Sequence, residues 1–359
     1  MIKYLGSKRR LVPALSAIAD AAGVRSAVDL FTGTTRVAQA FKSVGAHVTA
    51  VDTARYAHTF ARCYIETDAR SVDTAALASV LAGLDALPGR AGYVTDVFCQ
   101  QSRFFQPENG ARIDAIRDAI ARDWAGSDLE PILLTSLIEA ADRVDSTTGV
   151  QMAYVKQWAD RAQQPLRLRV PELLAGHGVA LFGDAVAIAP TLPAVDLAYL
   201  DPPYNQHRYT ANYHVWETLV AWDAPEHYGV ACKRTDLRDD PTTRSVFNAK
   251  REMPAALKGV IESLDARLLV VSFSNEGWVD IEELRQWCAT RGHVEIIAFD
   301  SKRYVGAQIG VYNPQGERVG EPTHMRNTEY LVLSGDRRLV DRSASAIATS
   351  AAGTTHIAG

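Results

Sequence analysis

The sequence has few cysteines and no motif that pairs them. Its 359 residues include four cysteines, which lie far apart and form no C-x-x-C pair: Cys63, Cys99, Cys232 and Cys288. This spacing predicts neither a zinc site nor a disulfide framework. We therefore expect reduced thiols within a folded core.

The sequence also lacks a long hydrophobic run. No stretch approaches the about 20 apolar residues that span a bilayer, and the N-terminal MIKYLGSKRR has no secretory signal pattern. These absences predict a cytoplasmic protein with no membrane partner.

An excess of basic charge is missing as well, since the net charge is -4. A polyanion partner would have to be bound by local basic clusters, although each cluster alone is more typical of a solvated surface. The clusters are Lys3 with Lys8, Arg9 and Arg10; Arg167 with Arg169; Lys233 with Arg234; and Lys302 with Arg303.

What the sequence does contain is an α/β pattern with enough apolar residues, 47%, for a substantial core. A helix is expected over residues 9–22. The stretch SAVDLFTGTTRVAQAFKSVGAHVTAVD then predicts a strand over 27–31, a helix over 35–44 and a strand over 47–51. Strand-like runs return at VALFGD, VDLAYLD, RLLVVSFSN, HVEIIAFD and EYLVLSG.

A long alanine-rich segment interrupts these strands, and its periodicity is helical. We interpret residues 64–177 as an inserted helical subdomain. Residues 1–63 and 178–336 would form the main α/β domain. Residues 337–359 are small and polar without periodicity, which predicts a flexible tail.

The turn DLFTGTT has the features of a ligand-binding loop. Gly33 lets the backbone approach a ligand closely, and the helix behind it offers free N–H groups. Asp52 follows about twenty residues later at the end of the next strand, where a carboxylate can accept the hydroxyls of a ribose. Thr35 replaces the second glycine of G-x-G-x-x-G, which argues against a dinucleotide. A tight turn followed by a chance acid is the alternative.

The stretch YLDPPY ends a buried strand with an acid, two prolines and an aromatic ring. Asp201 would emerge where a parallel strand stops, at the edge where an open α/β sheet binds ligands. Asp201 and the carbonyl of Pro202 could together accept both hydrogens of an exocyclic amine. Tyr204 offers a flat face on which a base can stack. A strand-ending Pro–Pro turn with a capping acid is the alternative.

Taken together, the sequence resembles the D12-class, Dam-like DNA adenine-N6 methyltransferases. Four stretches match in order: KYLGSK (3–8), DLFTGT (29–34), DPPY (201–204) and SFSNEG (272–277). The match covers residues 1 to about 63 and 178 to about 336, which the resemblance implies are the catalytic domain, with residues 64–177 as a target-recognition subdomain. The resemblance implies a Rossmann-like methyltransferase sheet, mostly parallel with an antiparallel C-terminal strand. It also implies S-adenosylmethionine as the cofactor, no metal, and double-stranded DNA as the substrate.

The resemblance assigns roles to residues position by position. The implied catalytic residues, which hold the target base, are Asp201, Pro202, Pro203 and Tyr204. The implied cofactor-binding residues are Tyr4, Gly6, Lys8, Asp29, Phe31, Gly33, Thr34, Asp52, Asp184 and Asp201. Thr35 departs from the F-x-G-x-G pattern of the family.

The expected nucleic-acid contacts come from basic, amide and aromatic side chains. Arginine and asparagine give bidentate contacts to base edges, and tyrosines can stack on an extruded base. The candidates are Lys8, Arg9, Arg103, Asn109, Arg112, Arg208, Tyr209, Tyr213, Lys302 and Arg303.

Three alternatives to adenine-N6 methylation of DNA remain open from the sequence. These are methylation of the N4 amine of cytosine, methylation of RNA, and a catalytically silent DNA-binding module. Asp201, rather than the serine frequent in cytosine enzymes, favours adenine, and the intact DPPY counts against a silent module. The chain carries no segment that resembles an endonuclease, so it would be either a modification subunit with a separate restriction endonuclease as its partner or a solitary methylase.

Overall fold

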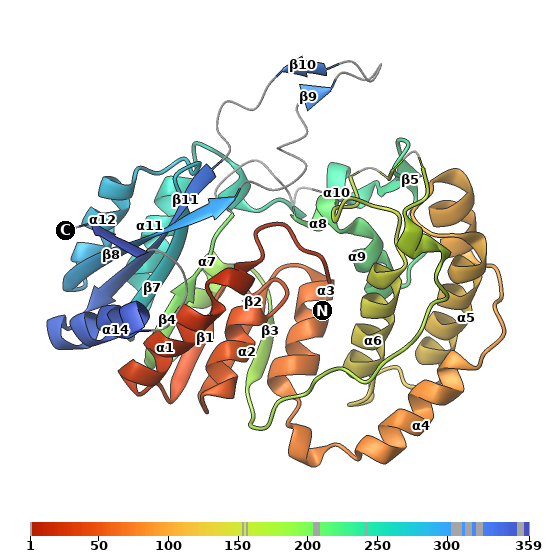
Figure 1. The fold of residues 1–359 in the computed structure, drawn as a ribbon, viewed down its shortest axis with the longest axis horizontal. Coiled ribbons are helices and arrows are strands. Elements are labelled where there is room, and N and C mark those ends of the chain that lie inside the picture. Colours follow the sequence, from red (N-terminus) through yellow and green to blue (C-terminus); the bar gives the residue numbers. More distant parts are fainter. Residues whose placement is uncertain are drawn as a thin grey trace. The chain divides into compact units, whose positions relative to one another are not determined.

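The computed structural model describes residues 2–152, 154–155, 157–203, 209–240, 243–302, 311–312, 318–320, 326–349 and 355–358. They form the predicted Rossmann-like α/β fold (Figure 1). Contacts divide the chain into two compact units. The first unit comprises residues 1–7, 32–184 and 207–245, and the second comprises 8–31, 185–206 and 246–359.

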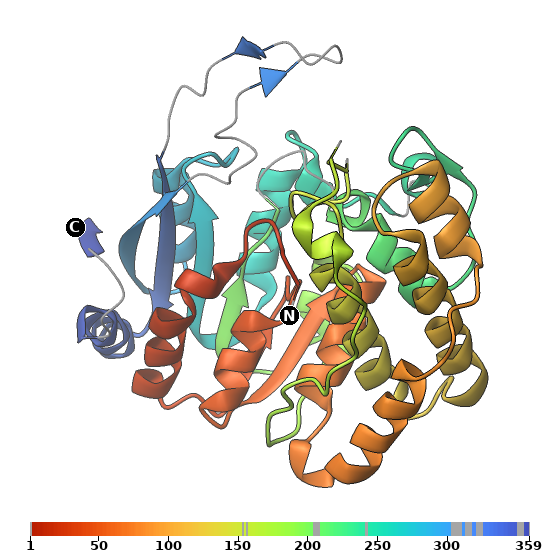
Figure 2. The same ribbon diagram turned by 45° about the vertical axis from the view of Figure 1, so that its right-hand side comes forward.

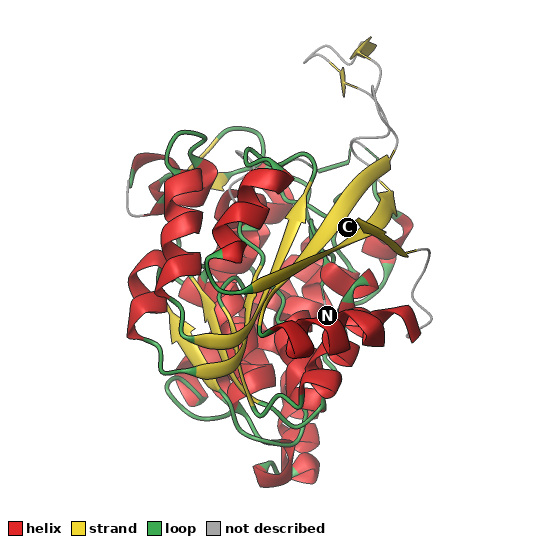
Figure 3. Ribbon diagram, turned by 90° about the vertical axis from the view of Figure 1, so that its left-hand side faces the viewer, coloured by secondary structure: helices red, strands yellow, loops and turns green. Residues whose placement is uncertain are grey.

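The second unit contains a sheet of six strands, drawn in yellow in Figure 3. In spatial order the strands are β12 (Thr355–Ala358), β8 (His293–Lys302), β11 (Arg326–Gly335), β7 (Ala266–Ser274), β4 (Val195–Leu200) and β1 (Ser26–Asp29). The strands β1, β4 and β7 pair in parallel, whereas β11 is antiparallel to both of its neighbours. The central strands are buried and apolar, as in the runs VDLAYL and LLVVSF. The predicted antiparallel strand near the C-terminus is therefore confirmed.

Helices of the second unit connect and cover these strands. They are η1 (Lys8–Arg10), α1 (Val12–Ala22), α7 (Ala185–Ile188), η6 (Ala189–Thr191), η8 (Val246–Asn248), α11 (Met253–Ser263), α12 (Ile281–Ala289) and α14 (Arg337–Thr349). A separate antiparallel pair consists of β9 (Val311–Tyr312) and β10 (Arg318–Gly320).

Helix α14 corrects the prediction of a flexible tail from residue 337. Val340, Ser343 and Ile347 are buried, and their spacing places them on one helical face. Small alanines and serines on this helix let it pack closely against α1, and Figures 1 and 2 both show α14 beside α1. The apolar positions are too few and too widely spaced among small residues for the pattern to be recognised without its partner helix.

The first unit contains the parallel pair β2 (His47–Asp52) and β3 (Val179–Phe182) together with most of the helices. Before β3 the chain forms α2 (Arg36–Ser43), α3 (Arg55–Ala61), η2 (Arg62–Glu66), η3 (Ala69–Ser71), α4 (Thr74–Asp85), η4 (Val94–Gln101), α5 (Pro107–Asp123), α6 (Glu130–Arg143) and η5 (Asp160–Gln163). After residue 207 it forms α8 (Tyr209–Asn212), α9 (His214–Ala221), β5 (His227–Tyr228), β6 (Lys233–Arg234) and α10 (Asp236–Asp239). The described part of residues 64–177 contains no strand, which confirms its predicted helical character.

Buried polar side chains of α5 bind backbone groups at the ends of neighbouring helices. The Asp114 carboxylate in α5 accepts N–H groups of Gly92, Val94 and Thr95 at the start of η4. Arg117, one turn further on, donates to carbonyls in the last turn of α9. The inserted helices are therefore fixed to the chain that follows the DPPY motif.

The described residues include no helix with the length and apolar character needed to cross a membrane.

Candidate functional site

The glycine loop before α2 is folded back on Tyr4. Gly33 has φ +50°, a left-handed conformation that glycine adopts without strain. A Cβ atom at this position would lie 3.2 Å from two atoms of the Tyr4 side chain. The Gly33 N–H donates a hydrogen bond of 2.8 Å to Oδ2 of Asp52. The loop therefore joins three of the predicted cofactor residues in one place.

Thr35, where the sequence departs from the F-x-G-x-G pattern, has a left-handed backbone. Its φ is +61°, which is uncommon and strained for a β-branched residue. The side chain is fully buried, and its hydroxyl donates to the Thr34 carbonyl and accepts from the Gln39 amide. These bonds hold the left-handed conformation of Thr35 in the loop.

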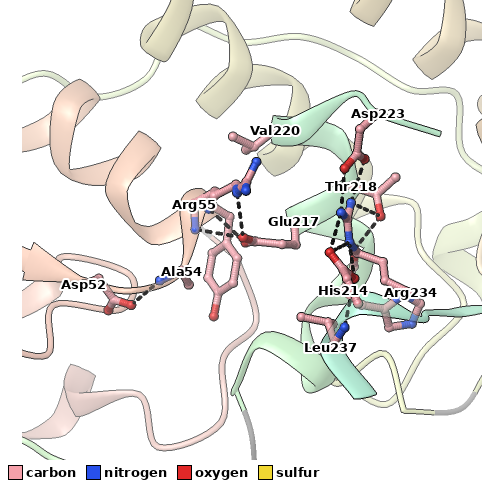
Figure 4. Close-up of polar contacts among 12 residues, drawn as sticks. Asp52, Ala54, Arg55, His214, Glu217, Thr218, Val220, Asp223, Arg234 and Leu237 are labelled. Carbon is pink, nitrogen blue, oxygen red and sulfur yellow. Dashed lines mark hydrogen bonds and ion pairs between the residues drawn. The ribbon is translucent and has the colours of Figure 1, made fainter. Parts of the chain in front are cut away.

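Asp52 ends β2 and is held by backbone N–H groups. Oδ1 accepts the N–H of Ala54 at 2.9 Å, as Figure 4 shows, and Oδ2 accepts that of Gly33. Burial raises the pKa of Asp52, and the N–H groups of Ala54, Gly33 and Thr53 oppose this rise. An ionised carboxylate has about four acceptor positions, so each oxygen retains one for a ligand hydroxyl.

Glu217 supports the segment that follows Asp52. Its carboxylate accepts the backbone N–H groups of Arg55 and Tyr56 at the start of α3, at 3.1 and 3.3 Å (Figure 4). Burial raises the pKa of Glu217 to about 7, against the lowering effect of these N–H groups. Glu217 lies on α9, which connects the chain after DPPY to the loop that carries Asp52.

Four tyrosines pack together beside the glycine loop. The Tyr4 ring stacks on Tyr213 and Tyr209, with centroids 4.6 and 5.4 Å apart, and meets Tyr56 edge-on. Tyr213 is 1% exposed, and its hydroxyl accepts the N–H of Leu5. The position of Tyr213 does not support its predicted role in stacking on DNA, because its ring is already covered.

Asp184 and Phe182 lie at the end of β3. Asp184 is half-buried two residues after the strand ends, whereas Phe182 pairs in register with Asp52 and is 53% exposed. β3 is an edge strand, and the exposed ring at its end is accessible to a ligand. The strand-ending aromatic in VALFGD was the available signal, and the sequence interpretation did not use it.

In the second unit, the end of β4 forms an ionic cluster. Asp201 follows the strand directly, and its Oδ1 lies 3.0 Å from Nζ of Lys8. The Lys8 ammonium also contacts Glu329 on β11, and the Lys8 side chain is only 7% exposed. Burial, with a further contribution from Glu329, raises the pKa of Asp201 to about 6, although Lys8 lowers it.

The neighbours of Asp201 are largely buried. Pro202 is buried and Pro203 is half-buried. Asp29 is 1% exposed, and Phe31 packs edge-on against Phe247. Tyr204, the last residue of the motif, lies outside the described residues.

Several predicted DNA contacts have structural partners. The Asn109 side chain is 5% exposed and bonds the backbone of Gln164 and Leu166. Arg112 donates to the carbonyl and the carboxylate of Asp85. These positions do not support a role for Asn109 or Arg112 in reading bases.

The remaining predicted contacts differ in exposure. Arg9 is exposed, and the half-buried Arg103 stacks on the Trp158 ring at 4.7 Å. Tyr209 is half-buried against Tyr4. The backbone of Lys302 ends β8, while Arg208 and Arg303 lie outside the described residues.

One group of metal-binding side chain types occurs in the described part of the chain. His293 Nε2 lies 3.1 Å from Glu295 and 3.4 Å from Asp341. These contacts join β8 to α14 as ion pairs when the histidine is protonated. The cluster contains none of the motif residues.

Comparison with known families agrees with the motifs. Residues 4–287 match the family described as D12 class N6 adenine-specific DNA methyltransferase. The chain belongs to this family. The match includes the DLFTGT, DPPY and SFSNEG stretches and all of KYLGSK except Lys3, so the resemblance predicted from the sequence is confirmed.

Curated relatives are named type II methyltransferases or modification methylases. The type II methyltransferase M.NlaIII of Neisseria lactamica is 30% identical over 342 residues, which cover 90% of this chain and 98% of the relative. The type II methyltransferase M.FokI of Planomicrobium okeanokoites is 34% identical over 53% of this chain and 29% of its own length. The modification methylase StsI of Streptococcus sanguinis is 26% identical over 79% of this chain and 45% of its own length. Similarity to M.NlaIII thus extends through nearly the whole chain.

Proposed function

We propose that this D12-class protein transfers a methyl group from S-adenosylmethionine to the N6 amine of an adenine that is flipped out of duplex DNA. The main support is the end of β4, where the ion-paired Asp201 is followed at once by Pro202. A carboxylate and a proline carbonyl are two acceptors for the two hydrogens of an exocyclic amine. The description of the family favours adenine over cytosine.

The residues of the first unit fit a nucleoside-bearing cofactor. Gly33 has no side chain to block a close approach, and Asp52 retains acceptor positions for two ribose hydroxyls. Phe182 offers an exposed aromatic face for a purine ring. When bound, S-adenosylmethionine supplies a methyl group on a positively charged sulfur.

The chemistry proposed for this chain is mainly positioning. Asp201 and the Pro202 carbonyl grip the amine and turn its lone pair towards the methyl carbon. The Asp201 carboxylate then accepts the proton that the methylated nitrogen loses.

Access to the amine requires that the base leave the helix, which costs a few kcal/mol. We propose that Tyr204 stacks on the extruded base and offsets part of that cost. Arg9 and Arg103 remain proposed contacts to DNA. A separate restriction endonuclease remains a proposed partner, because relatives carry the names modification methylase and type II methyltransferase.

Expression in a bacterial host that lacks DNA methylation tests this function. We expect single-molecule sequencing of the host DNA to detect N6-methyladenine in one short motif with the wild type and none with Asp201→Ala. Asp20→Ala, at an exposed position of α1, is the matched control and should methylate as the wild type does.

Other outcomes would contradict the proposal in distinct ways. Modified cytosine in place of modified adenine would show that the target base is cytosine. Unmodified DNA with a folded, cofactor-binding wild type would favour an RNA substrate. A folded protein without affinity for S-adenosylmethionine would favour the silent DNA-binding module.

A further inference from the structure

Lys8 lies between two carboxylates of the second unit. Its ammonium is 3.0 Å from Asp201 at the end of β4 and contacts Glu329 Oε1 on β11. The Ser272 hydroxyl on β7 donates to the same Glu329 oxygen at 3.2 Å. Three strands and the helix η1 therefore contribute to one cluster.

The burial of Lys8 determines what its charge can do. At 7% exposure, the ammonium is poorly placed to reach a DNA phosphate, so its position does not support the predicted contact of Lys8 with nucleic acid. A buried ammonium is stable only when its donors are satisfied by acceptors or opposite charges. Two carboxylates satisfy it here, and they are 19% and 20% exposed.

Sharing of the ammonium has a consequence for Asp201. If Lys8 paired with Asp201 alone, its charge would oppose proton binding by that carboxylate without any counterweight. Because the Lys8 ammonium also pairs with Glu329, Asp201 shares that positive charge, and the Glu329 carboxylate adds a negative charge near Asp201. The Asp201 carboxylate thereby remains a good acceptor for a hydrogen bond and for a proton.

We propose that Glu329 is a positioning residue for methyl transfer: it holds the Lys8 ammonium between itself and Asp201, and so keeps Asp201 able to accept the amine hydrogen. This inference rests on the proposed function. The amine nitrogen forms a bond to the methyl carbon while the carbon–sulfur bond breaks and its electrons stay on sulfur. The nitrogen becomes positively charged and regains neutrality when one of its protons moves to the Asp201 carboxylate.

Glu329 and Lys8 act on the pKa of Asp201 in opposite directions. The titratable groups around the cluster are Lys8, Glu329, Tyr199 and Asp29. Because Glu329 raises the pKa of Asp201, Glu329→Gln should lower it. Because Lys8 lowers the pKa, Lys8→Met should raise it.

Single-turnover methyl transfer across a range of pH tests the proposal. We expect the rate constant of Glu329→Gln at pH 8 to fall about 10-fold to 100-fold, with the affinity for S-adenosylhomocysteine within about threefold of the wild type. The acidic limb of the pH–rate profile, which lies near pH 6 in the wild type if Asp201 must be ionised, should move to lower pH. In Lys8→Met, it should move to higher pH.

Two further variants keep the test decisive. Glu329→Asp retains the charge and should recover part of the rate, with the acidic limb near its wild-type position. Glu295→Gln makes the same chemical change on β8, where Glu295 contacts His293, and should behave as the wild type does. Thermal melting establishes that each variant is folded, and Glu329→Asp carries the comparison if Glu329→Gln is not.

The outcomes separate this inference from the proposed function. A wild type that methylates DNA, with a Glu329→Gln variant of unchanged rate and profile, would overturn the inference alone. So would a lower rate without any movement of the acidic limb, because that is the result of a purely structural role. A wild type that yields no N6-methyladenine would overturn the proposed function.

Discussion

Asp52 and Asp201 both stand at the ends of parallel strands, but the protein holds them differently. Asp52, after β2, is bound by backbone N–H groups of Gly33 and Ala54. Asp201, after β4, is paired with the side chain of Lys8, which Glu329 also contacts. Backbone donors are fixed by the fold, whereas the interaction between two ionised side chains can be adjusted by a third charge.

The difference suggests a division of labour between the two carboxylates. A ligand whose hydroxyls must be held in one orientation is served by an acceptor that cannot turn. A carboxylate that must accept a proton during the reaction requires a tuned affinity for that proton. We expect substitutions to separate binding at Asp52 from chemistry at Asp201.

The largest expected effects come from removing each of the two carboxylates in turn. We expect Asp52→Ala to weaken binding of S-adenosylmethionine by about 30-fold to 1,000-fold, because hydrogen bonds from two ribose hydroxyls to a charged group are lost. Asp201→Ala should leave that affinity within about threefold, although methyl transfer is lost. Isothermal titration calorimetry measures the affinity of each variant for S-adenosylmethionine. Equal loss of affinity in both variants would refute the separate roles of Asp52 and Asp201.

Glu217 can be compared with Asp52, because it too is a carboxylate bound by backbone N–H groups. Its pKa of about 7 in the folded protein lies above the unfolded value near 4.5. The stability that this shift contributes is complete below about pH 4.5 and is lost as the pH rises through 7. Glu217→Gln has no such proton to lose, so its unfolding free energy should fall less than that of the wild type between pH 5 and pH 8.

Urea denaturation at several pH values measures this effect. Glu108→Gln, at an exposed position of α5, is the control and should follow the pH dependence of the wild type. If the unfolding free energies of Glu217→Gln and the wild type changed equally with pH, Glu217 would not hold its proton up to neutral pH.

The smallest effect should come from Thr35→Gly. Relief of the left-handed strain, about 1–2 kcal/mol, should offset the lost burial and the added chain entropy of glycine, so stability should change by less than about 1 kcal/mol. Gly33→Ala is the contrast, because its Cβ would meet Tyr4 at 3.2 Å, and it should destabilise by more than about 1 kcal/mol. Thermal melting compares the two, and a large loss in Thr35→Gly would show that its side-chain bonds, not the backbone path, maintain the loop.

Local patterns were sufficient to predict the elements that carry the motifs. The helix expected over 35–44 is α2 (Arg36–Ser43), and the strand expected over 47–51 is β2 (His47–Asp52). The contact between Gly33 and Asp52 also follows from their spacing, since a glycine turn and the next strand end at the same edge of a sheet. These features depend on short stretches of chain, which the sequence displays directly.

Contacts between distant segments could not be predicted in this way. Glu329 is 321 residues from Lys8, and nothing in RNTEYLVLS distinguishes this glutamate from one in contact with solvent. Asn109 and Arg112 have the side chains that read bases, yet tertiary packing uses them to bind backbone and a carboxylate. The polar residue types are the same in both roles, so only the burial of each side chain separates them.

The interleaving of the two units limits how the gene can be divided. The chain passes from one unit to the other after residues 7, 31, 184, 206 and 245. Three of these points fall within KYLGSK, DLFTGT and the FGDA segment. A single recombination event or one engineered break cannot transfer either unit intact, so exchange of target specificity between relatives must replace internal cassettes rather than one end of the coding sequence.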